Sequence, residues 1–179
     1  DSFERARQER TGKPKPVFRA KTLGNGQLEL PPLKLAHLRA LTDCTGLIQH
    51  AKFVVPDYSH GYSIDDNARA LILAVLLEEI SERPASESRY LARRYMAFMY
   101  NAFNHEEGRF RNFMGYNREW LEEVGSADSH CRSLWAMGVT AGRSRDRGLR
   151  DLACRLFEAG LPAIHMFTTP RSWAYALLG

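Results

Sequence analysis

A chain of 179 residues provides one core-bearing domain, and its 44% apolar content is typical of a globular protein. No apolar run approaches the roughly 18 residues that cross a bilayer, and the first residues lack the apolar stretch of a secretory signal, so we expect a cytoplasmic protein without a membrane span. The net charge of +4 resides in residues 1–21, where seven Lys or Arg face three acidic residues, and the remaining chain is charge-balanced. A basic leader can bind RNA or anionic lipid but is more often a solvated linker, so nucleic-acid binding is not expected.

The N-terminal segment differs in composition from the rest of the chain. Residues 1–31 are basic and, from Thr11 onward, rich in Pro and Gly, which predicts a linker or extended arm. Residues 32–179 are expected to form a helical domain that is incomplete at its C-terminus. Its first helix is expected over about residues 32–43, before Gly46, and a polar and aromatic loop follows over residues 49–63.

Five further helices are expected along the chain. The second is capped by Ser63 or Asp65 and runs to about Ser81, and its apolar residues on nearly every side predict burial. The third opens at Ser86, and the others cover about residues 127–141, 147–161 and 170–179. Between the third and fourth helices, charged and aromatic residues alternate in GRFRNF (residues 108–113), which predicts one short β-like hairpin loop.

Two of these helices open with the same pattern. An aspartate is followed four residues later by an arginine and an apolar run, first from Asp65 to Arg69 and again from Asp128 to Arg132. Residues four apart share one face of a helix, and an acid in the first turn interacts favourably with the helix dipole. If both helices face one cavity, Asp65, Asp66 and Asp128 converge at its mouth, where a polar, sugar-like ligand would meet them.

Five segments in this order resemble a known family. They are KLAHLRALTD (residues 34–43), SHGYSIDDNARAL (59–71), GRFRNF (108–113), WLEEVGSAD (120–128) and FTTPRSW (167–173). Together they resemble a bacterial all-α domain that is similar to the six-hairpin (α/α)6 glycosidase toroids. That domain is often joined to the C-terminus of a retaining family-4 glycosyltransferase of the GT-B type.

The resemblance implies an all-α fold of antiparallel helical hairpins that form part of an (α/α)6 toroid. A full toroid has twelve helices and this chain supplies six, so the resemblance implies that the rest of the parent chain or a second copy completes the ring. The alternative is an open helical bundle or solenoid, in which the arginines shared by the second, fourth and sixth helices (Arg69, Arg132 and Arg171) are a coincidence.

Glycosidases need two carboxyl groups beside the scissile bond, one to donate a proton and one to act as base or nucleophile. The candidate catalytic residues are acids at the N-termini of the expected helices and in loops: Asp65, Asp66, Glu123 and Asp128. The adjacent pair Asp65 and Asp66 is attractive because neighbouring like charges raise one pKa. The alternative is that one of the two caps the helix while the other pairs with Arg69.

Candidate sugar-binding residues lie in the same loops and helix openings. Trp120 offers a ring face for stacking, and Glu122 beside it offers a carboxylate for hydroxyl groups. The other candidates are polar or aromatic: His60, Tyr62, Arg69, Arg111, His130 and Arg132. For the arginines we favour a second interpretation, in which buried Asp–Arg pairs lock one hairpin to the next.

These observations predict a carbohydrate-associated domain of a glycosyltransferase-like protein. We expect the domain to bind a glycan or sugar substrate, and glycosidase-like acid/base chemistry is an open alternative. The alternative is a non-catalytic helical scaffold or oligomerisation domain, whose uncovered apolar helix faces meet a partner. The three cysteines, Cys44, Cys131 and Cys154, form no Cys-x-x-Cys pair, so we expect reduced thiols and neither a metal nor another cofactor.

Overall fold

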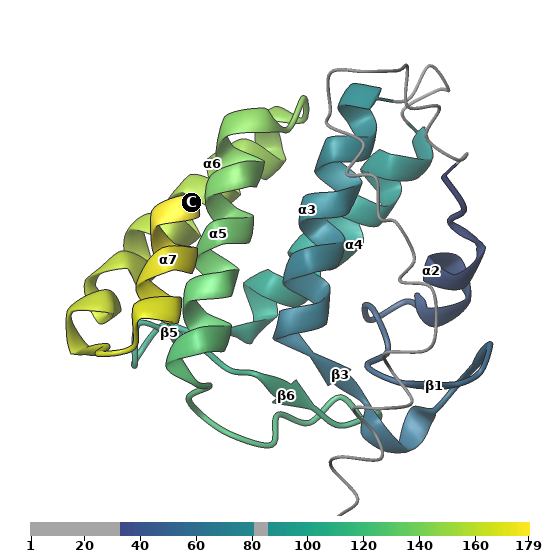
Figure 1. Cartoon of the computed structure of the whole chain (residues 1–179), viewed down its shortest axis with the longest axis horizontal. Helices are drawn as coiled ribbons and strands as arrows, with labels where there is room; N and C mark the ends of the chain where they lie inside the picture. Colours follow the sequence, from purple (N-terminus) through teal and green to yellow (C-terminus); the bar gives the residue numbers. More distant parts are fainter. Residues whose placement is uncertain (1–32, 81–85) are drawn as a thin grey trace, which may run out of the picture. The chain divides into compact units, whose positions relative to one another are not determined.

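In the computed structural model, which describes residues 33–80 and 86–179, the helices pack side by side, with α3, Ile64–Ile80, near the centre (Figure 1). Leu71 and Val75 are fully buried within this helix, because apolar residues occur on nearly every side of it, as the sequence predicted. The hydroxyl oxygen of Ser63 accepts a hydrogen bond from the Asp66 backbone N–H (3.2 Å) and so caps the helix.

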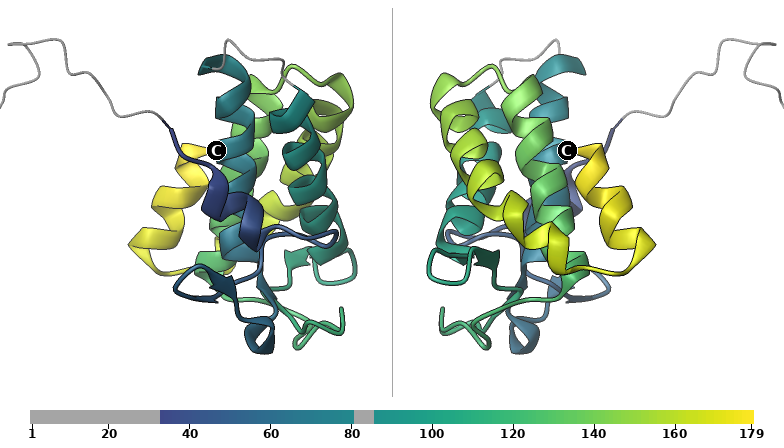
Figure 2. Two further views of the ribbon diagram at one scale, coloured as in Figure 1. Left: turned by 90° about the vertical axis from the view of Figure 1, so that its right-hand side faces the viewer. Right: turned by 90° about the vertical axis from the view of Figure 1, so that its left-hand side faces the viewer.

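Four more helices follow α3 in sequence order: α4 (Ser86–Ala102), α5 (Ala127–Arg143), α6 (Arg147–Gly160) and α7 (Pro170–Leu178). Helix α3 packs against α4 and α5, and α5 packs against α6 and α7. Figure 2 shows α4 and α6 on one side of the α3–α5 pair, whereas α7 meets α5 from the other side. Thus α3 with α4 and α5 with α6 form antiparallel hairpins, and the mostly helical fold is confirmed (Figure 1).

Short strands gather where α3 and α5 begin (Figure 1). Strand β1 (Ala51–Lys52) pairs with β2 (Val55–Pro56), β3 (Tyr62–Ser63) with β6 (Phe113–Met114), and β4 (Phe103–Asn104) with β5 (Arg109–Phe110), all antiparallel. The β4–β5 pair is the hairpin that the alternating sequence predicted. The other two pairs were not predicted, because no alternating pattern of this kind was recognised in the sequence around β1, β2 and β3.

The first described helix, α2 (Ala36–Leu41), is shorter than predicted at both ends. Residues 33–35 are not helical, and after Leu41 the chain forms a β-bridge between Thr42 and Leu47. The buried Asn67 of α3 fixes this turn. Its side-chain oxygen accepts the Leu47 N–H (2.8 Å), and its amide group donates to the Ser63 carbonyl (2.8 Å). The arm predicted for residues 1–31 lies outside the described residues.

Two 3-10 turns complete the described elements: Tyr58–His60 leads into β3, and Leu161–Met166 joins α6 to α7. From Lys34 to Gly179 the chain forms one compact unit with a continuous apolar core between the helices. None of the helices in residues 33–80 and 86–179 has the length and hydropathy needed to cross a bilayer.

Candidate functional site

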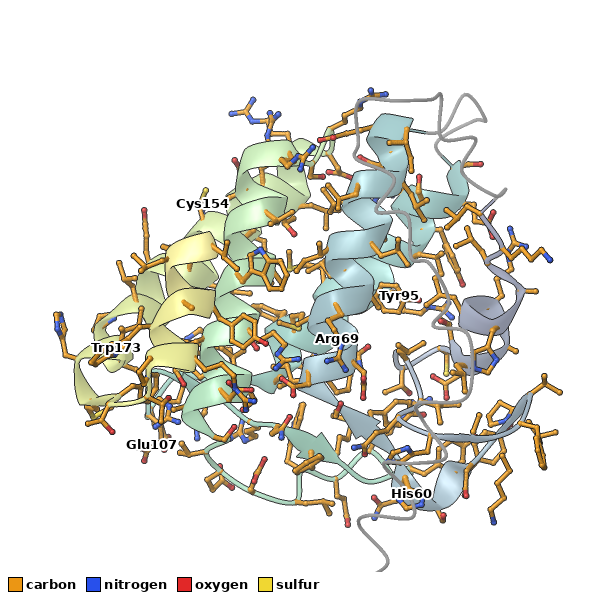
Figure 3. The ribbon with its side chains drawn as sticks, in the orientation of Figure 1. His60, Arg69, Tyr95, Glu107, Cys154 and Trp173 are labelled. Carbon is orange, nitrogen blue, oxygen red and sulfur yellow. The ribbon has the colours of Figure 1, made fainter. Side chains whose placement is uncertain are left out.

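A hollow of about 260 Å³ opens at the start of α3. It is lined by Gln49, His50, Ser63, Asp65, Asp66, Arg69, Asn112 and Phe113, which come from the loop before β1, from β3, from the first turns of α3 and from the start of β6. Figure 3 shows Arg69 on α3, with His60 in the loop region near its N-terminal end. Three of the residues singled out from the sequence, Asp65, Asp66 and Arg69, therefore line one cavity. We call it the α3 hollow.

On one wall of the α3 hollow, Asp66 binds two neighbours. One of its carboxylate oxygens forms an ion pair with Arg69, and the other accepts a hydrogen bond from the Ser63 hydroxyl (2.5 Å). The sequence left open which of Asp65 and Asp66 pairs with Arg69. In the structure Asp66 is the partner, and the Asp65 carboxylate is paired with Arg132 of α5.

Asp65 belongs to a chain of charges that joins three helices. Its carboxylate lies 3.3 Å from Nε of Arg132 on α5, and Arg132 also donates to Asp128 one turn earlier (2.9 Å). Asp128 in turn accepts from Nε of Arg171 on α7 (2.7 Å). The guanidinium of Arg132 lies 4.6 Å from the centre of the Tyr175 ring, also on α7. Asp–Arg contacts thus join α3 to α5 and α5 to α7. Of the three arginines only Arg132 is largely buried, as the favoured interpretation required, whereas the side chain of Arg171 is 72% exposed and Arg69 pairs within its own helix.

The two aspartates of this charge chain differ in their surroundings. Burial raises the pKa of the Asp65 carboxyl, and the positive charges of Arg132 and Arg69 oppose that rise only in part. The Oδ1 atom of Asp65 has no hydrogen-bond partner, since its contact with Arg132 is an ion pair without hydrogen-bond geometry. Asp128 instead has both carboxylate oxygens occupied by arginines. Of these two acids, Asp65 is therefore the one with a carboxylate oxygen that has no hydrogen-bond partner.

The loop that contains Trp120, Glu122 and Glu123 does not line the α3 hollow. Oε1 of Glu122 accepts the backbone N–H groups of Asn112 and Phe113 (2.8 and 3.1 Å), so it holds the chain that leads into β6. Glu123 pairs with Arg111 (2.7 Å), and the ring of Trp120 packs near Phe98 with 5.5 Å between ring centres. This loop therefore supports the floor of the site, and its acids do not converge with Asp65.

Two candidate binding residues, His130 and Tyr62, are buried in the core. Nδ1 of His130 accepts the Phe110 N–H (3.2 Å), and Nε2 lies 3.0 Å from the Gly160 carbonyl oxygen, so both ring nitrogens are used. The Tyr62 hydroxyl donates to Asp43 (2.5 Å). Neither side chain is accessible to a ligand, and we leave both out of the site.

His60 does not line the α3 hollow, but its ring contacts that of His50, which does. His50 was not among the residues singled out from the sequence. The two imidazole rings are 4.5 Å apart in an edge-to-face contact, and His50 lines the hollow. Gln49 and Asn112 were also missed. Short polar loop residues carry no periodicity, and only the pairing of β3 with β6 brings Asn112 to the start of α3.

Comparisons with family models, with curated proteins and with solved structures found no match to this chain. Within residues 33–80 and 86–179, no group of three or more His, Cys, Asp or Glu side chains is placed to hold a metal ion. The interpretation of the α3 hollow therefore depends on its own geometry and chemistry.

Proposed function

We propose that the α3 hollow binds a carbohydrate, the ligand class implied by the resemblance to glycosyltransferase-associated toroid domains. The observation that carries this proposal is the convergence of the acids Asp65 and Asp66, the guanidinium of Arg69 and the exposed ring of Phe113 around one cavity. A sugar presents hydroxyl groups that donate and accept hydrogen bonds, and a C–H face that stacks on aromatic rings. The lining of the α3 hollow offers a counterpart to each.

Unsatisfied polar atoms of the lining support a polar ligand. Oδ1 of Asn112 and Oδ1 of Asp65 are both buried, and neither has a hydrogen-bond partner among the described residues. A buried acceptor without a partner costs about 1–3 kcal/mol, and a ligand hydroxyl in the α3 hollow could donate to these oxygens after a small rotation of the side chain.

If binding leads to hydrolysis, the acids of the α3 hollow are the ones placed to carry it. Asp65, whose pKa is raised by burial, is suited to donate a proton to the leaving oxygen, and Asp66 is suited to act as the base. Glu123 pairs with Arg111, Asp128 pairs with Arg132 and Arg171, and neither acid lines the hollow. We therefore restrict the proposed catalytic pair to Asp65 and Asp66.

A glycan array, followed by titration of the best glycan, tests the proposal. Phe113→Ala removes the stacking surface, and Asp66→Asn removes a charge while keeping an acceptor for Ser63, so each is expected to weaken binding by about tenfold or more, roughly 1.4 kcal/mol. Asp151→Asn is the matched control, because Asp151 is an exposed acid on α6. The proposal would be contradicted if the wild type bound no glycan, or if all three variants bound the glycan with the affinity of the wild type.

On a larger scale, we propose that this unit is part of an (α/α)6 toroid in a glycosyltransferase-like protein. One feature favours the second candidate function, a scaffold or oligomerisation domain: α7 exposes Trp173, Leu177 and Leu178, and Leu177 is 87% exposed. Figure 3 shows Trp173 on this helix. Large exposed apolar side chains mark surfaces for a partner, such as the rest of the parent chain or a second copy. Light scattering would detect a dimer, whereas the glycan titration detects the first function.

A further inference from the structure

A second hollow, of about 420 Å³, lies on the other face of β6. Successive residues of a strand point to opposite faces, and accordingly Phe113 lines the α3 hollow while Met114 lines this one. Its remaining walls include Cys44, Phe98, Asn101, Arg118 and Trp120. We call it the Trp120 hollow. It shares no lining residue with the α3 hollow, so it offers separate chemistry.

One wall of the Trp120 hollow is apolar and aromatic. The rings of Phe98 and Trp120 lie 5.5 Å apart at an interplanar angle of 58°, and Met114 is buried beside them. Such a wall fits a flat apolar body, because aromatic rings gain both buried area and favourable ring-to-ring contacts.

The rim of the Trp120 hollow carries a cation. The guanidinium of Arg118 donates to Sγ of Cys44 (2.9 Å), and no acid within the described ranges forms an ion pair with it. The adjacent Glu119 instead accepts from the Asn117 amide (2.6 Å). The backbone of Arg118 has a φ of 66°, which is unfavourable for a residue with a Cβ.

We infer that the Trp120 hollow binds a small organic anion, a carboxylate on a flat apolar body. The carboxylate is held by the guanidinium of Arg118 beside the Cys44 thiol, and the apolar body lies against Trp120 and Met114. A guanidinium without an acidic partner is charge-complementary to a carboxylate, and arginine binds this group in a bidentate manner. This site is independent of the sugar proposed for the α3 hollow.

Cys44 provides a reporter for the test, with two internal controls. Cys44 and Cys154 are both exposed, and Figure 3 places Cys154 on α6. Cys131 is buried, and burial raises the pKa of its thiol to about 11, so it stays unmodified while the protein is folded. Alkylation at each cysteine can be followed by peptide mass spectrometry.

The first experiment compares iodoacetate, an anion, with iodoacetamide, its neutral counterpart. The rate at Cys44 relative to Cys154 is expected to be at least about fivefold higher with iodoacetate, because Arg118 attracts the carboxylate. Arg118→Asn should abolish this preference, since Asn tolerates a positive φ but carries no charge, and Arg118→Lys should retain part of it. Equal ratios for both reagents, or an unchanged preference in Arg118→Asn, would overturn the inference.

The second experiment tests the apolar body of the ligand with phenylacetate as the probe. At millimolar concentration, phenylacetate is expected to slow the reaction of iodoacetamide with Cys44 by about fivefold and to leave Cys154 unchanged. Neutral phenylacetamide should protect much less, and Arg118→Asn should remove the protection by phenylacetate. Protection by neither compound, or equal protection by both, contradicts a site for an anion.

Discussion

Among single residues, Phe53 combines an unfavourable backbone with an unfavourable side-chain environment. It is the first of two turn residues between β1 and β2, its φ is 57°, and its side chain is 98% exposed. Glycine is preferred where only the first residue of a two-residue turn has a positive φ, because it has no Cβ. We predict that Phe53→Gly raises the free energy of unfolding by about 0.5–1 kcal/mol, as measured by urea denaturation.

The adjacent Val54 supplies the control for this prediction. It is also exposed, but its φ is not positive, so glycine at this position only adds freedom to the unfolded chain. Val54→Gly is expected to lower the free energy of unfolding by about 0.5–1 kcal/mol. A loss of stability in both variants would show that positive φ at Phe53 carries no cost.

The charged residues show how far sequence reasoning reaches at this scale. The sequence indicated that Asp65, Asp128, Arg69 and Arg132 would pair, and they do. It gave the right partner for Arg132, which pairs with Asp128, and left two candidates for Arg69, of which Asp66 is the partner. Spacing along one helix describes contacts within that helix, whereas Asp65 pairs with α5, a contact that depends on how two helices pack. For the same reason, His130 could not be recognised as a core residue.

At the scale of helices, α7 approaches α5 closely at Gly138. A Cβ at this position would lie 2.2 Å from the Gly179 carbonyl oxygen and 2.6 Å from its carbonyl carbon. Gly138→Ala therefore requires the end of α7 to move away from α5. We predict that amide hydrogen exchange over residues 170–178 becomes about tenfold faster, which corresponds to a loss of about 1.4 kcal/mol in local stability.

Gly142, one turn further along α5, is the matched control. A Cβ there meets nothing within 4 Å, so alanine only improves helix propensity. Gly142→Ala is expected to raise the free energy of unfolding by up to about 1 kcal/mol and to leave exchange in α7 unchanged. If the two alanine variants behave alike, the close approach at Gly138 does not hold α7.

The sequence predicted the larger elements well and the smaller ones poorly. Helices α3, α4, α5, α6 and α7 begin within a residue or two of the expected positions, because capping residues and prolines mark helix starts. The first helix was predicted too long at both ends, and the bridge between Thr42 and Leu47 accounts for its early end. The α3 hollow was predicted only in its helical wall. Its other wall, Asn112 and Phe113, depends on pairing between residues about fifty positions apart.

At the scale of the whole molecule, His130 connects elements from three parts of the chain. It projects from α5, accepts the Phe110 N–H of β5 through Nδ1, and lies within hydrogen-bond distance of Gly160 at the end of α6. Its ring also contacts Phe167, with 5.5 Å between ring centres. Protonation of Nδ1 would remove the acceptor for Phe110 and place a charge in the core. Burial accordingly lowers the pKa of His130 to about 4, from 6.5 for a free histidine.

This difference in pKa predicts how stability depends on pH. The unfolded chain takes up a proton at this histidine near pH 6.5, whereas the folded protein does so only near pH 4, so between these values the unfolded state binds more protons. The free energy of unfolding should therefore fall as the pH falls through this window, by up to roughly 3 kcal/mol, and this contribution levels off below about pH 4. Urea denaturation between pH 7 and pH 4 measures the loss.

A histidine variant isolates this contribution from that of the acids. His130→Gln keeps an amide that can donate and accept but has no proton to gain, so it should be less stable at pH 7 and lose less stability on acidification. The Asp65 carboxyl contributes with the opposite sign, because a raised folded pKa favours the folded state as the pH falls. That contribution is common to both proteins and cancels in the comparison. NMR titration of the wild type gives the independent check, since a His130 ring that protonates near pH 6.5 in the folded protein would contradict its role as a neutral link in the core.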